Sequence, residues 1–240
     1  MLYFLCKLDL NQEKVGRKLK FSYFSLRNMR EKLAKKTQAV EALQFMKQIL
    51  ERIAPVNPVD LQKLLNKFEV VQVPKNEIII NEGEIADSFY CIYKGIVRIY
   101  YYKDGKAVIE RFEKENGFFG GNFTHLTKKP GIHVYETLEP SILLRMKFAD
   151  LEELCAISHD IEHLYRITIG LFHNNFVDRI YTFKALSTEK RYHEFIRQYG
   201  DIINRISMRN VANYLGMSSE TLSRIRAKYD KFPDDHQTEK

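Results

Sequence analysis

The chain has 240 residues, a formal net charge of +7, 45% hydrophobic residues and three cysteines. This length allows one or two domains with substantial cores, and no run of about 18 apolar residues predicts a membrane span. The apolar start, residues 1–7, is too short for a signal peptide. Cys6, Cys91 and Cys155 are isolated, which favours reduced thiols over a disulfide framework or a metal cluster. We therefore expect a cytoplasmic protein without a metal site or a bound cofactor.

The excess positive charge lies in the N-terminal quarter of the chain. Residues 1–56 carry twelve Lys or Arg against five Asp or Glu, and the remainder is balanced. Residues 1–36 have little periodicity and are interpreted as a basic extension. Three interpretations of this extension are open: a nucleic-acid-binding arm, a poorly ordered segment, or residues that precede a native start at Met29 or Met46. The net charge is consequently no evidence that the rest of the chain binds DNA.

Residues 37–158 are predicted to form two helices followed by a sensor-like β domain. The first helix begins at Thr37 and ends at Pro55, and Asn57 with Pro58 caps the second. From Val70 the pattern changes to short β-type runs separated by turn residues. The expected strands are 71–73, 78–80, 89–93, 96–102, 107–112 and 141–146. Asp104-Gly105 between two of them is a strong hairpin signal, and such regularly spaced strands predict a small barrel or roll.

A short helix over 149–156 and a long helix over 159–185 follow. The long helix carries a wide apolar face, and such a face requires a partner. A second copy of the chain, related by a two-fold axis, is the simplest partner. The residues expected in this dimer interface are Ile161, Tyr165, Thr168, Phe172, Phe176, Ile180 and Phe183.

Residues 186–240 are predicted to be helical, with two short helices joined by a tight turn. Ser207 is the expected cap of the first, Gly216 its left-handed end, and Ser218 or Ser219 the cap of the second. Four basic residues and one acid, Glu220, lie between residues 206 and 228. This pattern is typical of a helix-turn-helix that binds DNA, and an ordinary helical hairpin with a solvated charged face is the alternative.

The order of these elements resembles the bacterial Crp/Fnr superfamily of transcription regulators. The motifs that carry the resemblance are Asn81-Glu-Gly-Glu84, Tyr90-Cys-Ile-Tyr-Lys-Gly95, Asp104-Gly-Lys106, Asn116-Gly-Phe-Phe-Gly120 and Met217-Ser-Ser-Glu-Thr-Leu-Ser-Arg224. The resemblance implies an α+β fold with an N-terminal antiparallel β-roll of the cyclic nucleotide-binding type. A long dimerisation helix and a C-terminal helix-turn-helix domain would follow. The short tail after Lys228 predicts a reduced or absent wing.

The resemblance also implies how DNA would be read. Glu220, Ser223 and Arg224 share a face at i, i+3 and i+4 and look like the recognition motif of the superfamily's anaerobic-regulator branch. In the major groove, Glu accepts from cytosine N4 and Arg contacts guanine O6 and N7. The residues expected to contact phosphate or to support the helix 219–228 are Ser218, Ser219, Thr221, Arg209, Arg226 and Lys228. The implied partners are a second copy, double-stranded DNA carrying a near-palindrome, and, as a further candidate, RNA polymerase.

The ligand-sensing end departs from the family pattern. The Glu and Arg of the cyclic-AMP phosphate cassette are absent from the stretch beginning at Gly120, and three scattered cysteines cannot hold an iron–sulfur cluster. We expect an effector other than cyclic AMP, or none. The residues that would line its pocket are Phe119, Gly120, Gly121, Asn122, Phe176 and Val177.

Two other functions are considered. His133 and Glu136 offer a His-x-x-Glu pair for a metal enzyme in a cupin-like roll, but a metal site needs further ligands and none is apparent. We therefore do not expect an enzyme. The second alternative is a ligand-binding or protein-interaction module whose helical tail docks a partner. A spacing of the two recognition helices that cannot match DNA would favour it.

Overall fold

The computed structural model describes residues 29–30, 33–121 and 124–231, and the chain divides into two compact units, residues 1–44 and 45–240. The described residues of the first unit are helical, and the helix over 33–53 continues into the second unit. This confirms the helix predicted from Thr37, with an earlier start and an end just before Pro55. No helix in the described part of the chain is long and apolar enough to cross a membrane.

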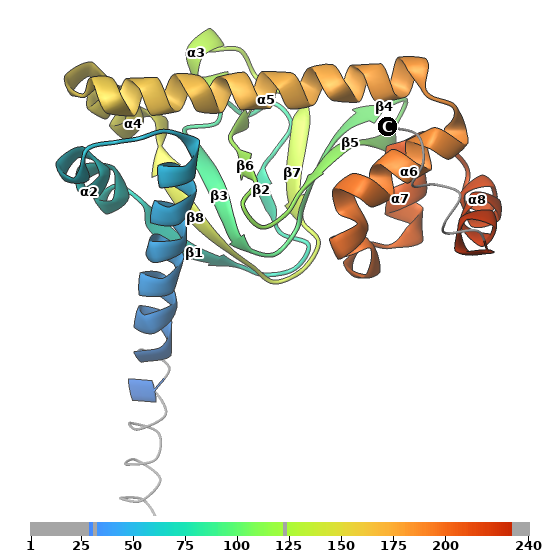
Figure 1. Ribbon diagram of the computed structural model, residues 1–240, viewed down its shortest axis with the longest axis horizontal. Coiled ribbons are helices and arrows are strands. Elements are labelled where there is room, and N and C mark those ends of the chain that lie inside the picture. Colours follow the sequence, from blue (N-terminus) through green and yellow to red (C-terminus); the bar gives the residue numbers. More distant parts are fainter. Residues whose placement is uncertain (1–28, 31–32, 122–123, 232–240) are drawn as a thin grey trace, which may run out of the picture. The chain divides into compact units, whose positions relative to one another are not determined.

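The second unit contains an antiparallel roll of two four-stranded sheets (Figure 1). The first sheet has the order β1 (Glu69–Val73), β8 (Ser141–Lys147), β3 (Ser88–Lys94) and β6 (Phe118–Phe119). The second has the order β2 (Ile78–Ile80), β7 (His133–Thr137), β4 (Val97–Lys103) and β5 (Lys106–Glu113). Buried side chains from both sheets, including Ile92, Ile99 and Leu143, form the core of the roll. The predicted roll is confirmed.

The β4–β5 hairpin forms at the turn that the sequence indicates. Lys103 is paired with Lys106, and the two residues between them, Asp104 and Gly105, have φ of 50° and 71°. Two successive positive φ angles are typical of the type I′ turn, whose twist matches that of the flanking strands. The strong local preference of Asp-Gly explains why this turn was predictable.

Two strands, β6 and β7, were not among those predicted. β6 has two residues, too few for any periodicity, and β7 is buried along most of its length. Alternation of polar and apolar residues is therefore absent from β7, where Glu136 and Thr137 are buried polar residues. Both strands are defined by pairing with strands distant in the sequence, β3 for β6 and β2 and β4 for β7.

Helices flank the roll. α2 (Pro58–Asn66) precedes it, α3 (Thr124–Thr127) lies within it, and α4 (Phe148–Ile157) leads into α5 (His159–Ala185). Asn57 caps α2 and Ser158 caps α5 through their side-chain oxygens. α5 runs along the roll (Figure 1), and Phe172 meets Phe118 of β6 edge-on at 6.3 Å between ring centroids. The predicted long helix thus has the expected bounds.

Residues 188–231, which follow α5, are helical in the structure. They form α6 (Thr188–Tyr199), a 3₁₀ helix (Gly200–Arg205), α7 (Met208–Leu215) and α8 (Ser219–Lys231). The prediction of a reduced or absent wing concerns the residues after α8, and residues 232–240 lie outside those described. It stays a prediction.

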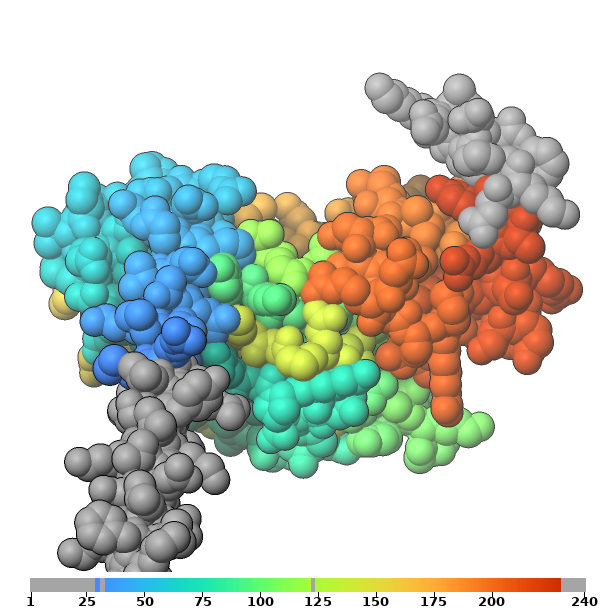
Figure 2. Space-filling model, turned by 90° about the horizontal axis from the view of Figure 1, so that it is seen from below, coloured from blue at the N-terminus to red at the C-terminus, as the bar shows by residue number. Residues whose placement is uncertain are grey.

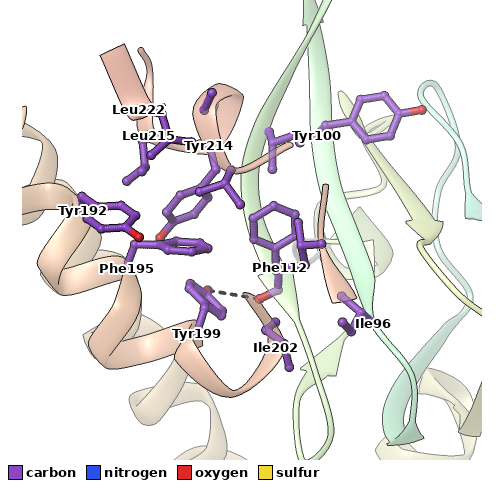
Figure 3. Packing of buried hydrophobic residues seen from close by; sticks show 14 of the residues in the cluster. Ile96, Tyr100, Phe112, Tyr192, Phe195, Tyr199, Ile202, Tyr214, Leu215 and Leu222 are labelled. Carbon is purple, nitrogen blue, oxygen red and sulfur yellow. Dashed lines mark hydrogen bonds between the residues drawn. The ribbon is translucent and has the colours of Figure 1, made fainter. Parts of the chain in front are cut away.

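A second hydrophobic core joins α6–α8 to the outer face of the β4–β5–β7 sheet (Figure 3). Phe112 of β5 lies at its centre, with ring centroids 5.9 Å from Tyr199 and 5.4 Å from Tyr214. The Tyr199 hydroxyl also donates to the Phe112 carbonyl at 3.1 Å. Buried aromatic rings contribute large apolar areas and specific edge contacts, so this core fixes α6–α8 against the roll.

Candidate nucleic-acid interface and effector site

The hairpin of α7 and α8 is built from the capping residues that the sequence indicates. Ser207 accepts a hydrogen bond from the Asn210 amide at the start of α7. α7 ends at Gly216, whose φ of 65° and ψ of 38° are left-handed and favour glycine. Ser218 Oγ then accepts from the Thr221 amide at 3.2 Å. Of the two serines proposed to cap α8, Ser218 is the one that does so.

α8 has one buried face and one exposed face. Leu222 and Ile225 are buried in the second core, whereas Glu220, Ser223 and Arg224 are exposed. These three residues are here called the reading face. Figure 2 shows α8, in red, at the surface of the molecule. The positions at i, i+3 and i+4 therefore present one polar surface to solvent, on a helix whose opposite side is anchored.

The electrostatics of the reading face keep a donor and an acceptor available. The backbone amide of Glu220 itself, the Ser218 hydroxyl and the nearby Arg224 charge hold the pKa of the Glu220 carboxyl below its usual range. Glu220 is thus ionised at neutral pH and accepts hydrogen bonds. Arg224 Nη2 contacts Thr221 Oγ1 at 3.5 Å, and its side chain is otherwise exposed.

Some of the residues predicted to contact phosphate or support α8 are exposed, and others contact neighbouring helices. Arg209 on α7 and Ser219 on α8 are exposed to solvent. Arg226 donates from Nη1 to Met208 Sδ at 3.4 Å, and Lys228 pairs with Glu189 of α6 at 3.1 Å. Arg226 and Lys228 therefore brace α8 against α7 and α6.

Asn213 of α7 makes a contact that the sequence did not indicate. Its Nδ2 donates to the Ala107 carbonyl at 2.8 Å, and its Oδ1 accepts from the Ile109 amide at 2.6 Å. β5 is the edge strand of its sheet, so this side-chain amide pairs with backbone groups that an added strand would otherwise use. Nothing local distinguishes Asn213 from a solvated helix residue, because its partners lie more than 100 residues away.

Residues 188–231, which form α6 to α8, are here called the helical module, and Arg205 provides a second polar connection between this module and the roll. Its guanidinium pairs with Glu115 at 2.7 Å and also with Glu139. Burial opposes ionisation of Glu115, but hydrogen bonds from Arg205 and from the Gly95 amide outweigh it and hold its pKa below the usual range. The helical module is consequently held on the roll by ion pairs as well as by the aromatic core.

α5 has two apolar faces, and the predicted dimer residues are divided between them. Ile161 is completely buried within its own chain, and Tyr165, Thr168 and Phe172 line a cavity of that chain. Phe183 packs beside Tyr214 at 6.2 Å between ring centroids. Ile180 is 56% exposed and Phe176 38%. Ile180 and the exposed Val177 and Tyr181 form what we call the outer stripe of α5, whereas Phe176 also borders a cavity on the inner face.

A cavity of about 120 Å³ lies between the inner face of α5, β6 and the helices α2 and α4. Of the residues predicted to line an effector pocket, Phe119, Gly120 and Phe176 border this roll cavity. Gly121 and Val177 are not among its lining residues, and Val177 is half exposed. Asn122 lies outside the described residues. The other walls include Leu64, Phe89, Phe148, Leu164 and Phe172, so the cavity is predominantly apolar.

The charged groups that border the roll cavity are already engaged. Arg111 pairs with Glu110 at 2.6 Å and with Glu113 at 2.9 Å. The His125 ring is stacked on Phe148 at 3.5 Å, and burial lowers its pKa, so it is neutral at pH 7. A cyclic phosphate would need free donors at this place, whereas an apolar molecule would not.

His133 and Glu136 do not converge on a metal site. His133 pairs with Glu110, whereas Glu136 accepts from Arg98 at 2.8 Å and from the Tyr100 hydroxyl at 3.1 Å. Side chains three residues apart on a strand point to opposite faces of the sheet. Among the residues that the structure describes, no group of three or more His, Cys, Asp or Glu could hold a metal ion. Burial also raises the pKa of the Cys91 and Cys155 thiols, which keeps both protonated.

The sequence of the roll is similar to that of a known domain family. Residues 70–158 match the family described as the cyclic nucleotide-binding domain. No curated protein sequence matches the chain. This match and solved structures of the same fold agree with the resemblance to the Crp/Fnr superfamily.

Three solved structures illustrate the shared fold. FixK2 from Bradyrhizobium japonicum is 23% identical with a TM-score of 0.57, over 68% of this chain and 85% of that one. The c-di-GMP-responsive global regulator CLP from Xanthomonas campestris is 15% identical with a TM-score of 0.56, over 73% and 92%. A CooA mutant from Carboxydothermus hydrogenoformans is 14% identical with a TM-score of 0.55, over 70% and 79%. Because all three identities are below 25%, these comparisons show a shared fold and nothing further.

Proposed function

We propose that the protein is a dimeric, sequence-specific DNA-binding transcription regulator of the cytoplasm. The observation that carries this proposal is the reading face, in which Glu220, Ser223 and Arg224 are exposed together on a helix anchored by Leu222 and Ile225. The shared fold supports it, since CLP is described as a global regulator. We infer that α7 and α8 act as a helix-turn-helix and that α8 enters the major groove.

Each residue of the reading face has chemistry suited to a base edge or a phosphate. The ionised Glu220 carboxylate accepts from cytosine N4, and the Arg224 guanidinium donates to guanine O6 and N7. Ser223, between them on the same face, donates to either kind of acceptor. The exposed Arg209 and the Ser219 hydroxyl are suited to phosphate contacts, which position the helix without carrying sequence information.

The outer stripe of α5 supports the dimer. Val177, Ile180 and Tyr181 are 49%, 56% and 63% exposed, which is unusual for large apolar side chains gathered on one helix face. A two-fold axis beside this stripe would bring it against its own copy and bury it. Two reading faces would then meet successive major grooves, about one helical turn (~34 Å) apart, on a near-palindromic site.

The roll cavity supports an effector that is not cyclic AMP. Its volume of about 120 Å³ is close to that of apolar cavities that bind benzene (~150 Å³), and a cyclic nucleotide is much larger. Its apolar walls and paired charges favour a small apolar molecule. RNA polymerase remains a further candidate partner.

Replacement of Arg224 by alanine tests the reading face directly. Arg224→Ala should cost about 1–3 kcal/mol of discrimination between a specific site and random DNA, because a bidentate guanine contact is lost. Arg226→Ala is the matched control on the same helix, since Arg226 contacts Met208. Binding isotherms for both variants on both DNAs provide the comparison, and equal discrimination by the two would reject the assignment.

The alternative, a protein-interaction module, rests on the same exposed helix. It would take precedence if neither variant nor wild type preferred any DNA sequence while the dimer was intact. Dimer mass and DNA binding are measured independently, so the role of the outer stripe in dimerisation can be tested apart from the role of the reading face in DNA binding.

A further inference from the structure

A second cavity, of about 190 Å³, lies where the roll meets the helical module. We call it the junction cavity. β5, α5, α6 and α7 all contribute to its walls, through residues such as Phe112, Thr182, Gln198 and Tyr214. A molecule bound there would touch both the roll and the helices that carry the reading face.

Arg179 of α5 is the unusual group in the junction cavity. Its guanidinium carbon lies 4.2 Å from the centre of the Tyr214 ring and 4.8 Å from that of Phe183. Its Nη1 is buried and has no hydrogen-bond acceptor among the described residues. Cation–π contacts hold the guanidinium in place, but they leave a charged donor without an acceptor, which is unfavourable in a buried position.

The other arginines of this cavity have partners of their own. Arg197 pairs with Glu194 at 2.5 Å, and Arg191 donates to the Leu186 carbonyl at 3.2 Å. Arg111 pairs with Glu113, which also borders the cavity. In the described part of the chain, Arg179 forms no ion pair, although Asp178 borders the same cavity. A guanidinium that is hydrogen-bonded to the Tyr214 side chain but has no carboxylate partner therefore borders a space large enough for several water molecules.

We infer that the junction cavity binds a small oxyanion, a carboxylate or a phosphate, whose oxygen accepts from the Arg179 guanidinium. Charge-assisted bonds to a guanidinium are among the strongest hydrogen bonds in proteins, and the planar group suits both kinds of oxyanion. The side chains of Tyr199 and Tyr214 also border this cavity. Because the walls belong to α5, α6 and α7, the bound anion ties the dimerisation helix to the helical module.

The binding step can be tested on the full-length protein without DNA. Sodium phosphate and sodium benzoate are titrated by calorimetry and by thermal melting at constant ionic strength, with sodium chloride as the blank. One or both oxyanions should give a saturable rise in melting temperature, and the one that binds more tightly identifies the headgroup. Absence of a saturable response to both overturns the inference.

Variants of α5 locate the site. Arg179→Gln should weaken binding at least about tenfold, the loss of one charge-assisted bond. Arg166→Gln removes the same charge from an exposed position of the same helix and should leave binding unchanged. Asn175→Phe, at an exposed position that borders the cavity, should block binding even if Arg179→Gln does not fold. Binding that survives Asn175→Phe would reject the site.

The proposed regulatory consequence rests on the proposed DNA-binding function and is measured separately. With the tighter oxyanion at saturation, affinity for specific DNA should change at least about threefold in wild type and not in Asn175→Phe. An unchanged DNA affinity with intact oxyanion binding would remove the coupling but leave the site. Failure of DNA binding alone would reject the DNA-binding function and leave the site.

Discussion

The reading face of α8 and the roll cavity are built on opposite principles. Glu220, Ser223 and Arg224 face water, so their hydrogen-bonding groups stay available to a partner. The roll cavity is lined by apolar side chains, and its cation, Arg111, is already paired with two carboxylates. The proposed DNA contact thus uses hydrogen-bonding groups that are free at the surface, whereas the roll cavity offers few free groups to a charged ligand.

The second core connects these two regions. Phe112 belongs to the roll, yet its ring packs against Phe195, Tyr199 and Tyr214 of the helical module. Asn213 and Arg205 add polar bonds across the same boundary. A displacement of the roll would therefore reach α8 through a packed interface, which transmits strain because protein cores resist deformation.

The largest effect is expected from breaking this connection. Phe112→Ala should lower the free energy of unfolding by about 3–5 kcal/mol, because it leaves a cavity among three aromatic rings. Phe118→Ala removes a half-buried phenylalanine of the same roll and should cost less. Denaturant unfolding measures both. Equal costs would show that the second core does not hold the two regions together.

A charge on the outer stripe tests whether the reading face acts in pairs. Ile180→Glu should weaken the dimer by on the order of 3 kcal/mol, through lost apolar burial and repulsion between copies. Leu171→Glu, nine residues away, is the control, because it lies on the opposite side of α5 and is similarly exposed (50%). Sedimentation gives both masses. A dimer that persists in Ile180→Glu but not in Leu171→Glu would show that the interface lies on the side of α5 that carries Leu171.

A smaller, pH-dependent effect on stability is expected at the N-terminal end of α5, where Ser158 donates a hydrogen bond to Asp60 of α2. Hydrogen bonds from Lys63, Ser158 and Asn57 hold the pKa of Asp60 well below its usual range. The ionised carboxylate therefore contributes stability above the unfolded pKa of about 4, and this contribution is lost as the pH falls toward the folded pKa. Asp60→Asn should flatten the decline of unfolding free energy in acid. Identical acid profiles would exclude this contribution.

Cyclic nucleotides should have no effect at the roll cavity. Cyclic AMP and cyclic GMP at millimolar concentration should leave the melting temperature unchanged, whereas a specific ligand at 100 times its Kd would add about 2.7 kcal/mol. Indole, an apolar probe, should raise it. A saturable shift with either nucleotide would contradict the contrast between a polar reading face and an apolar interior.

Local signals were sufficient for much of the fold. The bounds of α5, the Asp104-Gly105 turn and the Gly216 end of α7 follow from capping and turn preferences of neighbouring residues. The short strand β6 and the mostly buried β7 depend on distant pairing, which hydrophobic periodicity does not report.

The arrangement of the candidate DNA-binding residues was predictable within one helix but not between helices. Helical spacing placed Glu220, Ser223 and Arg224 together, because a single helix determines their arrangement. It could not show that Arg226 and Lys228 contact α7 and α6, or that Ile161 is buried in its own chain. The bonds of Asn213 and the position of Arg179 between two rings likewise arise from tertiary packing.

Selection of bound sequences from random double-stranded DNA tests the central claim most directly. The wild-type dimer should enrich a near-palindrome whose half-sites are separated by about one helical turn, with G·C pairs at the positions that Arg224 and Glu220 contact. Arg224→Ala should relax the preference at one of those positions in each half-site. Recovery of no common sequence by a dimeric, folded protein would contradict the account.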